Sequence, residues 1–160
     1  MTAAAAAFLD ANVLYSSVIR NLLMYLHLGG LYRPAWSDAV HDEWIEALLR
    51  QRTDLNRGQL QRTRDLMNEH ALGASITDFE HLIPSLELPD AKDRHVVAAA
   101  ITCGADFIVT MNVRDFPAHV LAPNGIRAIH PDEFVLDLSL TAFEADHQVH
   151  ARTWKIRVPR

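Results

Sequence analysis

The segment from residue 88 to residue 110 restricts the possible folds more than any other part of the chain. Its first part, LPDAKDRHVVAAAITCGAD, repeats apolar residues at helical spacing, and Gly104 is typical of a helix end. The next four residues, FIVT, are apolar and rich in β-branched side chains, which favours a buried strand. A helix that leads directly into a short buried strand is the unit from which α/β domains are built.

The same alternation extends over most of the chain. Strands or short extended pieces are predicted at 6–10, at Leu31 and Tyr32, and at 74–79, 107–110 and 126–129. Helices are predicted over 12–28, from the N-cap Ser37, over 57–70 and from Pro131. We therefore expect an α/β fold with a central parallel sheet of about four or five strands flanked by helices. The apolar positions of the helix over 57–70 (Leu60, Leu66 and Met67) are expected to face inward.

The length of 160 residues suits one domain, which we place at 1–138, followed by a C-terminal extension over 139–160 that is helical or loosely packed. The net charge of −5 argues against a protein that coats nucleic acid through basic charge alone. The chain has a single cysteine, no apolar run long enough to span a bilayer, and no basic segment before its alanine run. These features lead us to expect a cytoplasmic protein without a membrane anchor.

Acidic residues recur at the ends of the predicted elements. Asp10 ends the first strand, Asp115 follows the strand FIVT, and Asp90 and Asp93 stand at the start of a helix. Glu43 lies in the helix that begins at Ser37. Because ligands of open parallel sheets bind beyond the carboxyl ends of the strands, several of these acids are expected near one site.

Two interpretations of these acids remain open from the residues themselves. Asp10, Asp90 and Asp93 are well placed to cap helices, Asp115 to form a turn, and Glu43 to lie in solvent. Alternatively the acids converge, and their mutual repulsion is relieved by a divalent cation. Oxygen ligands select hard cations such as Mg²⁺ or Mn²⁺, which can promote cleavage of a phosphodiester bond.

Four motifs together resemble the PIN-domain family, in particular its toxins of toxin–antitoxin pairs. They are FLDANVL, SDAVHDE, PDAKDRHVVAAAITCGADFIVTMNVRDFP and GIRAIHPDEF, and the resemblance extends over residues 7 to 138. It implies a ribonuclease that depends on Mg²⁺ or Mn²⁺ and is blocked by a cognate antitoxin protein. The first strand is richer in alanine than is usual in the family, and residues 139–160 have no clear counterpart.

The resemblance also assigns roles to individual residues. The four family acids, which bind metal and serve catalysis, fall on Asp10, Glu43, Asp93 and Asp115. The supporting polar positions, which hold the acids or contact metal-bound water, fall on Asn12, Thr110 and Asn112, with Asp90 as a neighbouring acid.

Two further features each have two interpretations. A group of arginines could grip RNA phosphates or form a solvated, partly self-neutralised face: Arg50, Arg52, Arg57, Arg62 and Arg64. A second set, Trp36, Trp44, Leu22, Leu23 and Leu26, could line the groove in which such toxins hold an antitoxin helix, or could be ordinary core. The nine histidines, including His95 near the acids, are interpreted as structural or surface residues. Homodimers are common in the family.

Two other functions compete with the metal-dependent ribonuclease. The first is a receiver-like signalling module with an acid as phosphoacceptor, although Lys92 and Lys155 are poorly placed for it. The second is a PIN fold that has lost activity and only binds a partner, which the complete set of four acids disfavours.

Overall fold

A four-stranded parallel sheet forms the centre of the molecule in the computed structural model, which describes residues 3–156 and the side chains of residues 3–146. The strand order is β2-β1-β3-β4, and every pairing is parallel. The strands are β1 (Ala6–Leu9), β2 (Arg33–Ala35), β3 (Phe107–Val109) and β4 (Arg127–Ile129). The predicted fold class is confirmed, with four strands in the sheet.

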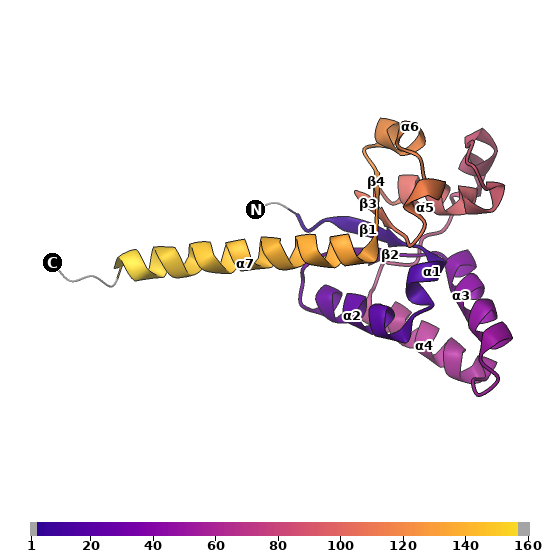
Figure 1. Cartoon of the computed structure of the whole chain (residues 1–160), viewed down its shortest axis with the longest axis horizontal. Helices are drawn as coiled ribbons and strands as arrows, with labels where there is room; N and C mark the ends of the chain where they lie inside the picture. The colour runs from indigo at the N-terminus through magenta and orange to yellow at the C-terminus, as the bar shows by residue number, and fades with distance from the viewer. Residues whose placement is uncertain (1–2, 157–160) are drawn as a thin grey trace.

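Helices cover the sheet on both sides (Figure 1). On one side lie α5 (Arg94–Thr102) and α6 (Ala118–Leu121); on the other lie α1 (Ala11–Leu14), α2 (Ser17–Leu28), α3 (Asp38–Gln51) and α4 (Arg57–His70). Short 3₁₀ helices complete the connections: η1 (Glu80–Ser85), η2 (Ala91–Asp93), η3 (Val113–Asp115) and η4 (Ala122–Asn124). This layering is that of an α/β domain.

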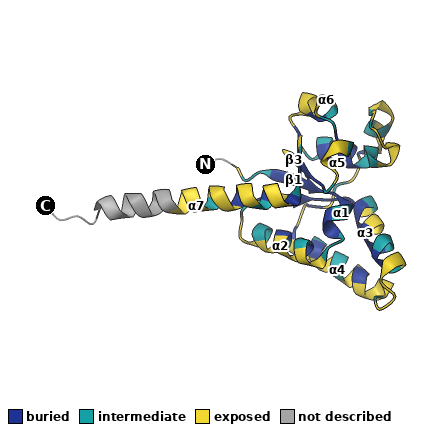
Figure 2. Cartoon of the chain, in the orientation of Figure 1, coloured by how far each residue is buried: buried dark blue, intermediate teal, exposed yellow. Residues whose placement is uncertain are grey.

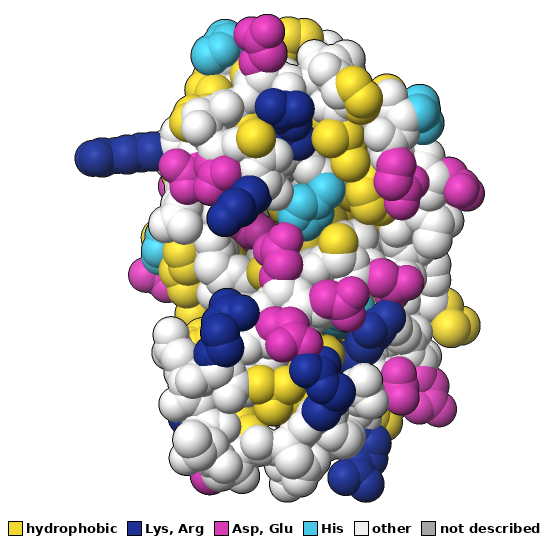
Figure 3. All heavy atoms as spheres, turned by 90° about the vertical axis from the view of Figure 1, so that its right-hand side faces the viewer, with side chains coloured by type: hydrophobic (Ala, Val, Ile, Leu, Met, Phe, Trp, Pro, Cys, Tyr) yellow, Lys and Arg dark blue, Asp and Glu magenta, His cyan; other side chains and the backbone are white. Residues whose placement is uncertain are grey.

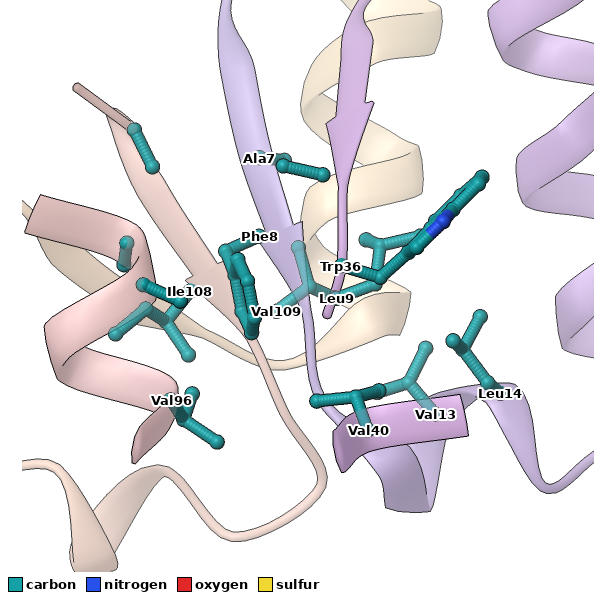
Figure 4. Close-up of a cluster of buried hydrophobic side chains, with 14 of the residues drawn as sticks. Ala7, Phe8, Leu9, Val13, Leu14, Trp36, Val40, Val96, Ile108 and Val109 are labelled. Carbon is teal, nitrogen blue, oxygen red and sulfur yellow. The ribbon is translucent and has the colours of Figure 1, made fainter. Parts of the chain in front are cut away.

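The two central strands carry the core. All four residues of β1 are buried, because helices cover both faces of the sheet (Figure 2). Phe8 and Ile108 pair in register and lie on the side of Val96 from α5, whereas Leu9 lies on the side of Trp36 (Figure 4). The alanines of β1 are thus part of a fully packed strand.

The strand β2 differs from the predicted position. It contains Pro34 itself, paired with Ala7, rather than Leu31 and Tyr32 before the proline. Proline has no backbone N–H, so it cannot donate a hydrogen bond to a neighbouring strand. This is tolerated in β2 because β2 is an edge strand whose only neighbour in the sheet is β1. The edge position therefore explains why the proline is accommodated.

The predicted helix over 12–28 is divided into α1 and α2. The helix is interrupted at Ser16. The Ser16 side chain accepts a hydrogen bond from the backbone N–H of Ile19, so Ser16 is the N-cap of α2. In an unbroken helix over 12–28, the helical spacing of apolar residues would have placed Val18 and Tyr25 on the buried side, and this expectation is wrong. Val18 and Tyr25 are exposed, whereas Arg20 and Leu23 are the buried residues of α2.

The two tryptophans of the predicted groove belong to the core. Trp36 and Trp44 are fully buried, and their indole N–H groups donate to Asn68 and His41 at 2.7 and 3.0 Å. These two residues therefore support the core interpretation of that set rather than the groove. In α4 the prediction also failed at Leu66, which is exposed.

The long helix α7 (Pro131–Ile156) continues through the predicted boundary at residue 138 without a break. It starts at the sheet, where Phe134 packs edge-on against Tyr32, and then extends away from the body (Figure 1). The extension is therefore helical through residue 156, and residues 157–160 lie outside the described part. Within that part, no helix has the length and apolar character needed to cross a membrane.

Candidate metal centre

The register between β1 and β3 brings the ends of two strands together. Leu9 pairs with Val109, so Asp10 and Thr110 follow their strands at the same edge of the sheet. The backbone N–H of Asp10 continues the ladder by donating to the carbonyl oxygen of Val109 at 3.0 Å. This edge is the carboxyl edge, where parallel sheets bind their ligands.

The Asp10 carboxylate is buried, with 5% of the residue exposed, and both of its oxygens are held. Oδ1 accepts from the backbone N–H of Ala11 at 2.8 Å, so Asp10 is also the N-cap of α1. Oδ2 accepts from the Thr110 hydroxyl at 2.9 Å and from the Asn12 amide at 3.2 Å. Burial raises the pKa of Asp10 despite these bonds, which favour its charged form.

The supporting polar residues form a network around Asp10. The Asn12 amide nitrogen also lies 3.3 Å from the Thr110 hydroxyl, and its oxygen accepts from the backbone N–H of Met111 at 3.1 Å. Asn112 contributes its backbone N–H, which donates to the Thr110 hydroxyl oxygen at 3.1 Å. The network ties the end of β1 to the loop after β3 and restricts rotation of the Asp10 side chain.

Asp93 faces the other acids from the start of α5. The short helix η2 ends at Asp93, which is partly buried and makes no capping hydrogen bond. Burial first, and then the negative charges of Asp10, Asp90, Asp115 and Glu43 in that order, raise the pKa of Asp93 from 3.8 to about 6. This shift shows that the four proposed acids share one electrostatic environment.

Glu43 projects from α3 and is held by a histidine of α5. The Oε1 atom of Glu43 lies 2.6 Å from Nε2 of His95, a side chain that is mostly buried. Burial opposes protonation of His95, but the hydrogen bond with Glu43 and nearby negative charges outweigh it and raise the pKa of His95. His95 is therefore part of the acidic cluster, although the sequence had suggested only a structural or surface role.

The remaining two acids differ in their surroundings. Asp115 ends η3 in the loop after β3, and its side chain is half-buried near Asp93. Asp90 is exposed, and its side chain accepts from the backbone N–H of Lys92 at 2.9 Å. Asp90 therefore caps η2, as the capping alternative predicted, and adds negative charge to the site from outside.

The carboxylate oxygens of these acids suit a hard cation, although they do not converge on one point in this structure. Asp10, Asp93 and Asp115 have no lysine or arginine partner among the described ion pairs. Within the part of the chain with described side chains, no three acidic, histidine or cysteine groups are arranged to hold one metal ion. Part of the reason is that the Glu43 carboxylate is engaged by His95.

A hollow of about 640 Å³ adjoins this cluster between α1 and α3. Asn12, Tyr15, Glu43 and Arg50 are among its lining residues. Acidic and basic side chains alternate on the corresponding face of the molecule (Figure 3). The hollow therefore extends the acidic site along the surface of α3.

The arginine group is largely neutralised by neighbouring acids. Arg52 pairs with Asp54, Arg57 with Glu46, and Arg64 with both Asp38 and Asp42. These four ion pairs support the self-neutralised interpretation for Arg52, Arg57 and Arg64. The other two members, Arg50 and Arg62, are exposed and have no such pair among the described residues.

The raised pKa of Asp93 predicts a pH dependence of stability in the absence of divalent cations. Between about pH 4 and pH 6 the folded protein keeps a proton that the unfolded chain has released, so the free energy of unfolding falls as pH rises. We expect Asp93 to account for about 1 kcal/mol of this fall, reduced from the full shift because its side chain is partly solvated.

Urea unfolding of the protein and of Asp93→Asn across this range, with a chelator present, measures the effect. In Asp93→Asn the free energy of unfolding should fall less steeply as pH rises. In Asp65→Asn, which changes an exposed position on α4, it should fall as steeply as in the unmodified protein. If the free energy of unfolding depended on pH in the same way in the protein and in Asp93→Asn, the pKa of Asp93 would not be raised in the folded state.

Known proteins share both sequence and fold with this chain. The family model described as PIN domain matches residues 6–114. A curated relative from Mycobacterium tuberculosis, named "Putative ribonuclease VapC50", is 54% identical over 46 residues, which is 29% of this chain and only 27% of the relative.

Two solved structures have similar folds. Structures of VapBC-1 from nontypeable Haemophilus influenzae and of VapBC2 from Rickettsia felis, the latter bound to a promoter DNA fragment, align with TM-scores of 0.52 and 0.49 and identities of 16% and 17%. The alignments cover 79% and 78% of this chain and 98% of each matched chain. The first of these likenesses supports the fold alone. Because the family model covers more than half of the residues, including the strands that carry Asp10 and Thr110, this chain belongs to the PIN domain family.

Proposed function

We propose that this protein is an endoribonuclease that depends on Mg²⁺ or Mn²⁺. One observation carries the proposal: carboxylates from separate parts of the chain lie close enough that burial, together with the charges of Asp10, Asp115 and Glu43, raises the pKa of Asp93 to about 6. A protein gains nothing in stability from such an arrangement, and a bound divalent cation would relieve it. Asp10, Glu43, Asp93 and Asp115 are the residues that would hold the ion.

The chain's own residues prepare the site for that ion. Bound there, a hard divalent cation supplies a hydroxide at neutral pH and stabilises the leaving oxygen of a phosphodiester. Thr110 and Asn12 fix Asp10 so that its carboxylate needs little reorganisation. Glu43 has to turn from His95 to join the other acids, which makes it the mobile member of the set.

The first experiment tests for the activity itself. The purified protein should cleave single-stranded RNA when Mn²⁺ is present and should be inactive when a chelator is present. Attack by water with departure of the 3′-oxygen leaves a 3′-hydroxyl and a 5′-phosphate, whereas attack by the ribose 2′-hydroxyl leaves a 2′,3′-cyclic phosphate and a 5′-hydroxyl, so end analysis identifies the nucleophile. No cleavage together with no Mn²⁺ binding in calorimetry would instead support an inactive PIN fold that binds a partner.

We also propose that the enzyme is the toxin of a toxin–antitoxin pair. The local identity of 54% to the M. tuberculosis relative and the resemblance to PIN-domain toxins support this role. Induction of the gene should arrest growth, and induction of the Asp10→Asn variant should not. A small neighbouring gene whose product restores growth would be the antitoxin. Growth arrest that persists in Asp10→Asn would separate toxicity from nuclease chemistry.

Arg50 is the arginine that we expect to contact RNA, because it lines the hollow beside Glu43 and has no described acidic partner. Arg50→Ala should weaken RNA binding several-fold and reduce the salt dependence by about one phosphate contact. Arg64→Ala is the matched control, since Arg64 is already paired with Asp38 and Asp42 and should change binding little. Equal losses for the two variants would contradict a specific role for Arg50.

A further inference from the structure

Arg20 is an arginine buried in α2 without a counter-charge. Only 7% of its surface is exposed, and no carboxylate among the described residues forms an ion pair with it. Burial lowers the pKa of its guanidinium, and no neighbouring acid offsets this effect. Arginines are seldom buried unless they are paired, so its position calls for an explanation.

The contacts of Arg20 satisfy only part of its guanidinium group. Nη1 donates to the carbonyl oxygen of Leu14 at 2.7 Å, and the group lies 4.7 Å from the centre of the Trp44 ring. The Nε atom is buried and has no partner. The Trp44 ring face attracts the positive charge, but neither this ring nor the Leu14 carbonyl carries the negative charge that would neutralise it.

Arg20 lines a hollow of about 600 Å³ that is rich in hydrogen-bond donors. Ser16, Ser17, Arg52 and Gln59 are among the other lining residues. The Gln59 side-chain oxygen accepts from the backbone N–H of residue 56, and its amide nitrogen is a further donor on a lining residue of the hollow. This combination of donors and positive charge is suited to an anion.

The backbone adds to the positive potential of this hollow. The twelve-residue helix α2 begins at Ser17, so the first turn of α2 borders the site. The N-terminal turn of a helix carries partial positive charge and unpaired N–H groups. A phosphate group is a common ligand at such a position.

The hollow around Arg20 adjoins the hollow that contains Glu43. Tyr15 lines both this hollow and the neighbouring one that contains Glu43 and Asn12. Its hydroxyl donates to Gln51 at 2.6 Å, and its ring lies between the two hollows, where a base could stack. A nucleic-acid strand that passes Tyr15 would therefore bring its next phosphates toward Arg20.

We propose that the hollow formed by Ser17, Arg20 and Gln59 holds a backbone phosphate of the RNA that flanks the cleaved bond. The proposal rests on the ribonuclease function proposed above and adds a binding subsite to it. RNA is favoured over a free anion because this hollow shares Tyr15 with the hollow beside Glu43, and only a polymer occupies both places at once. The phosphate supplies the counter-charge that the fold does not provide for Arg20.

The sharpest test places a carboxylate in the hollow. Ser17 lies one turn from Arg20 on α2, so Ser17→Asp can pair with the guanidinium and also suits the start of a helix. We expect Ser17→Asp to raise the melting temperature and to weaken RNA binding about tenfold, with a salt dependence reduced by about one phosphate. A gain in stability with a loss of binding is not expected from a residue with only a structural role.

Binding is measured by fluorescence anisotropy of a labelled single-stranded RNA, with Asp10→Asn in every protein to prevent cleavage. Ser139→Asp, at an exposed position on α7, is the matched control for the added negative charge and should bind RNA within about twofold of the parent. Equal weakening by both serine variants would overturn the subsite, because the effect would then come from net charge. Unchanged binding by Ser17→Asp would overturn it directly.

Substitutions of Arg20 itself provide an independent measurement. Arg20→Lys keeps the charge and should retain most of the affinity for RNA, whereas Arg20→Gln should lose about tenfold. Inorganic phosphate should raise the melting temperature of the unmodified protein but not that of Ser17→Asp. Stabilisation by phosphate with no effect of any of these variants on RNA affinity would reveal a site for small anions only and overturn the proposal.

The outcomes also separate this proposal from the proposed enzymatic function. Normal Mn²⁺-dependent cleavage with unchanged RNA affinity in Ser17→Asp would disprove the subsite and leave the ribonuclease intact. Absence of cleavage by the unmodified protein would contradict the ribonuclease, whatever the phosphate measurement shows.

Discussion

Asp10→Asn is expected to lower Mn²⁺-dependent RNA cleavage by about a thousandfold, equivalent to about 4 kcal/mol of transition-state stabilisation. The reason is the loss of the one carboxylate that the fold holds rigidly at the carboxyl edge of the sheet. Its oxygens are bound by Ala11, Asn12 and Thr110, so no other acid of the cluster can take its place without rearranging that network.

The same substitution should preserve the fold. An asparagine at this position can still accept from the Ala11 backbone N–H as an N-cap. Removal of a buried charge should leave the melting temperature in the absence of metal equal or higher. Cleavage rates, circular dichroism and melting curves measured on the same preparation test both parts of the prediction.

Asp90→Asn is the matched control for this experiment. Asp90 also caps a helix beside the acidic cluster but is exposed, and asparagine is an equally good N-cap for η2. We expect its cleavage rate to stay within a few-fold of the unmodified protein. If Asp10→Asn cleaved RNA at the normal rate, the acidic cluster would not be the catalytic centre.

Added Mn²⁺ should raise the melting temperature substantially, and this is the second large effect that we expect. Without a cation, the charges of Asp10 and Glu43 act on Asp93 and disfavour its ionised form. A cation at one hundred times its dissociation constant stabilises a folded protein by about 2.7 kcal/mol. For a domain of this size that corresponds to a rise of about 5–10 °C.

Variants of the cluster should separate stability from metal binding. Asp93→Asn should melt at an equal or higher temperature than the unmodified protein when a chelator is present, because it removes the repelled charge, but it should gain little from Mn²⁺. Asp54→Asn, an exposed acid paired with Arg52 away from the cluster, should keep the full response to Mn²⁺. An unchanged melting temperature on addition of Mn²⁺ to the unmodified protein would contradict a metal centre.

His95 shows what local sequence could not reveal about the site. Its position two residues after Asp93 placed it near the acids, but the sequence had no means of pairing it with Glu43, 52 positions earlier in the chain. The contact exists because α3 and α5 come together at the carboxyl edge of the sheet. The signal that could have identified it is the helical turn that it shares with Asp93.

The sequence by itself determined most of the elements and the order of the acids. The helix over 57–70, the strands around Phe8 and Ile108, and the placement of Asp10 after a strand follow from local periodicity and capping, which depend on neighbouring residues. These elements could be predicted locally because a helix and a buried strand each require apolar residues at characteristic positions along the chain.

Only the tertiary structure decided which side of each helix is buried and which charges meet. Because α2 starts anew after Ser16, a different side of the helix is exposed and Arg20 is buried. An unbroken helical pattern could not have indicated this. The register of Leu9 with Val109 brought Asp10 to Thr110 across 100 positions of the chain. Burial and electrostatic repulsion depend on such long-range contacts, so the chemistry of the site becomes readable only once the chain is folded.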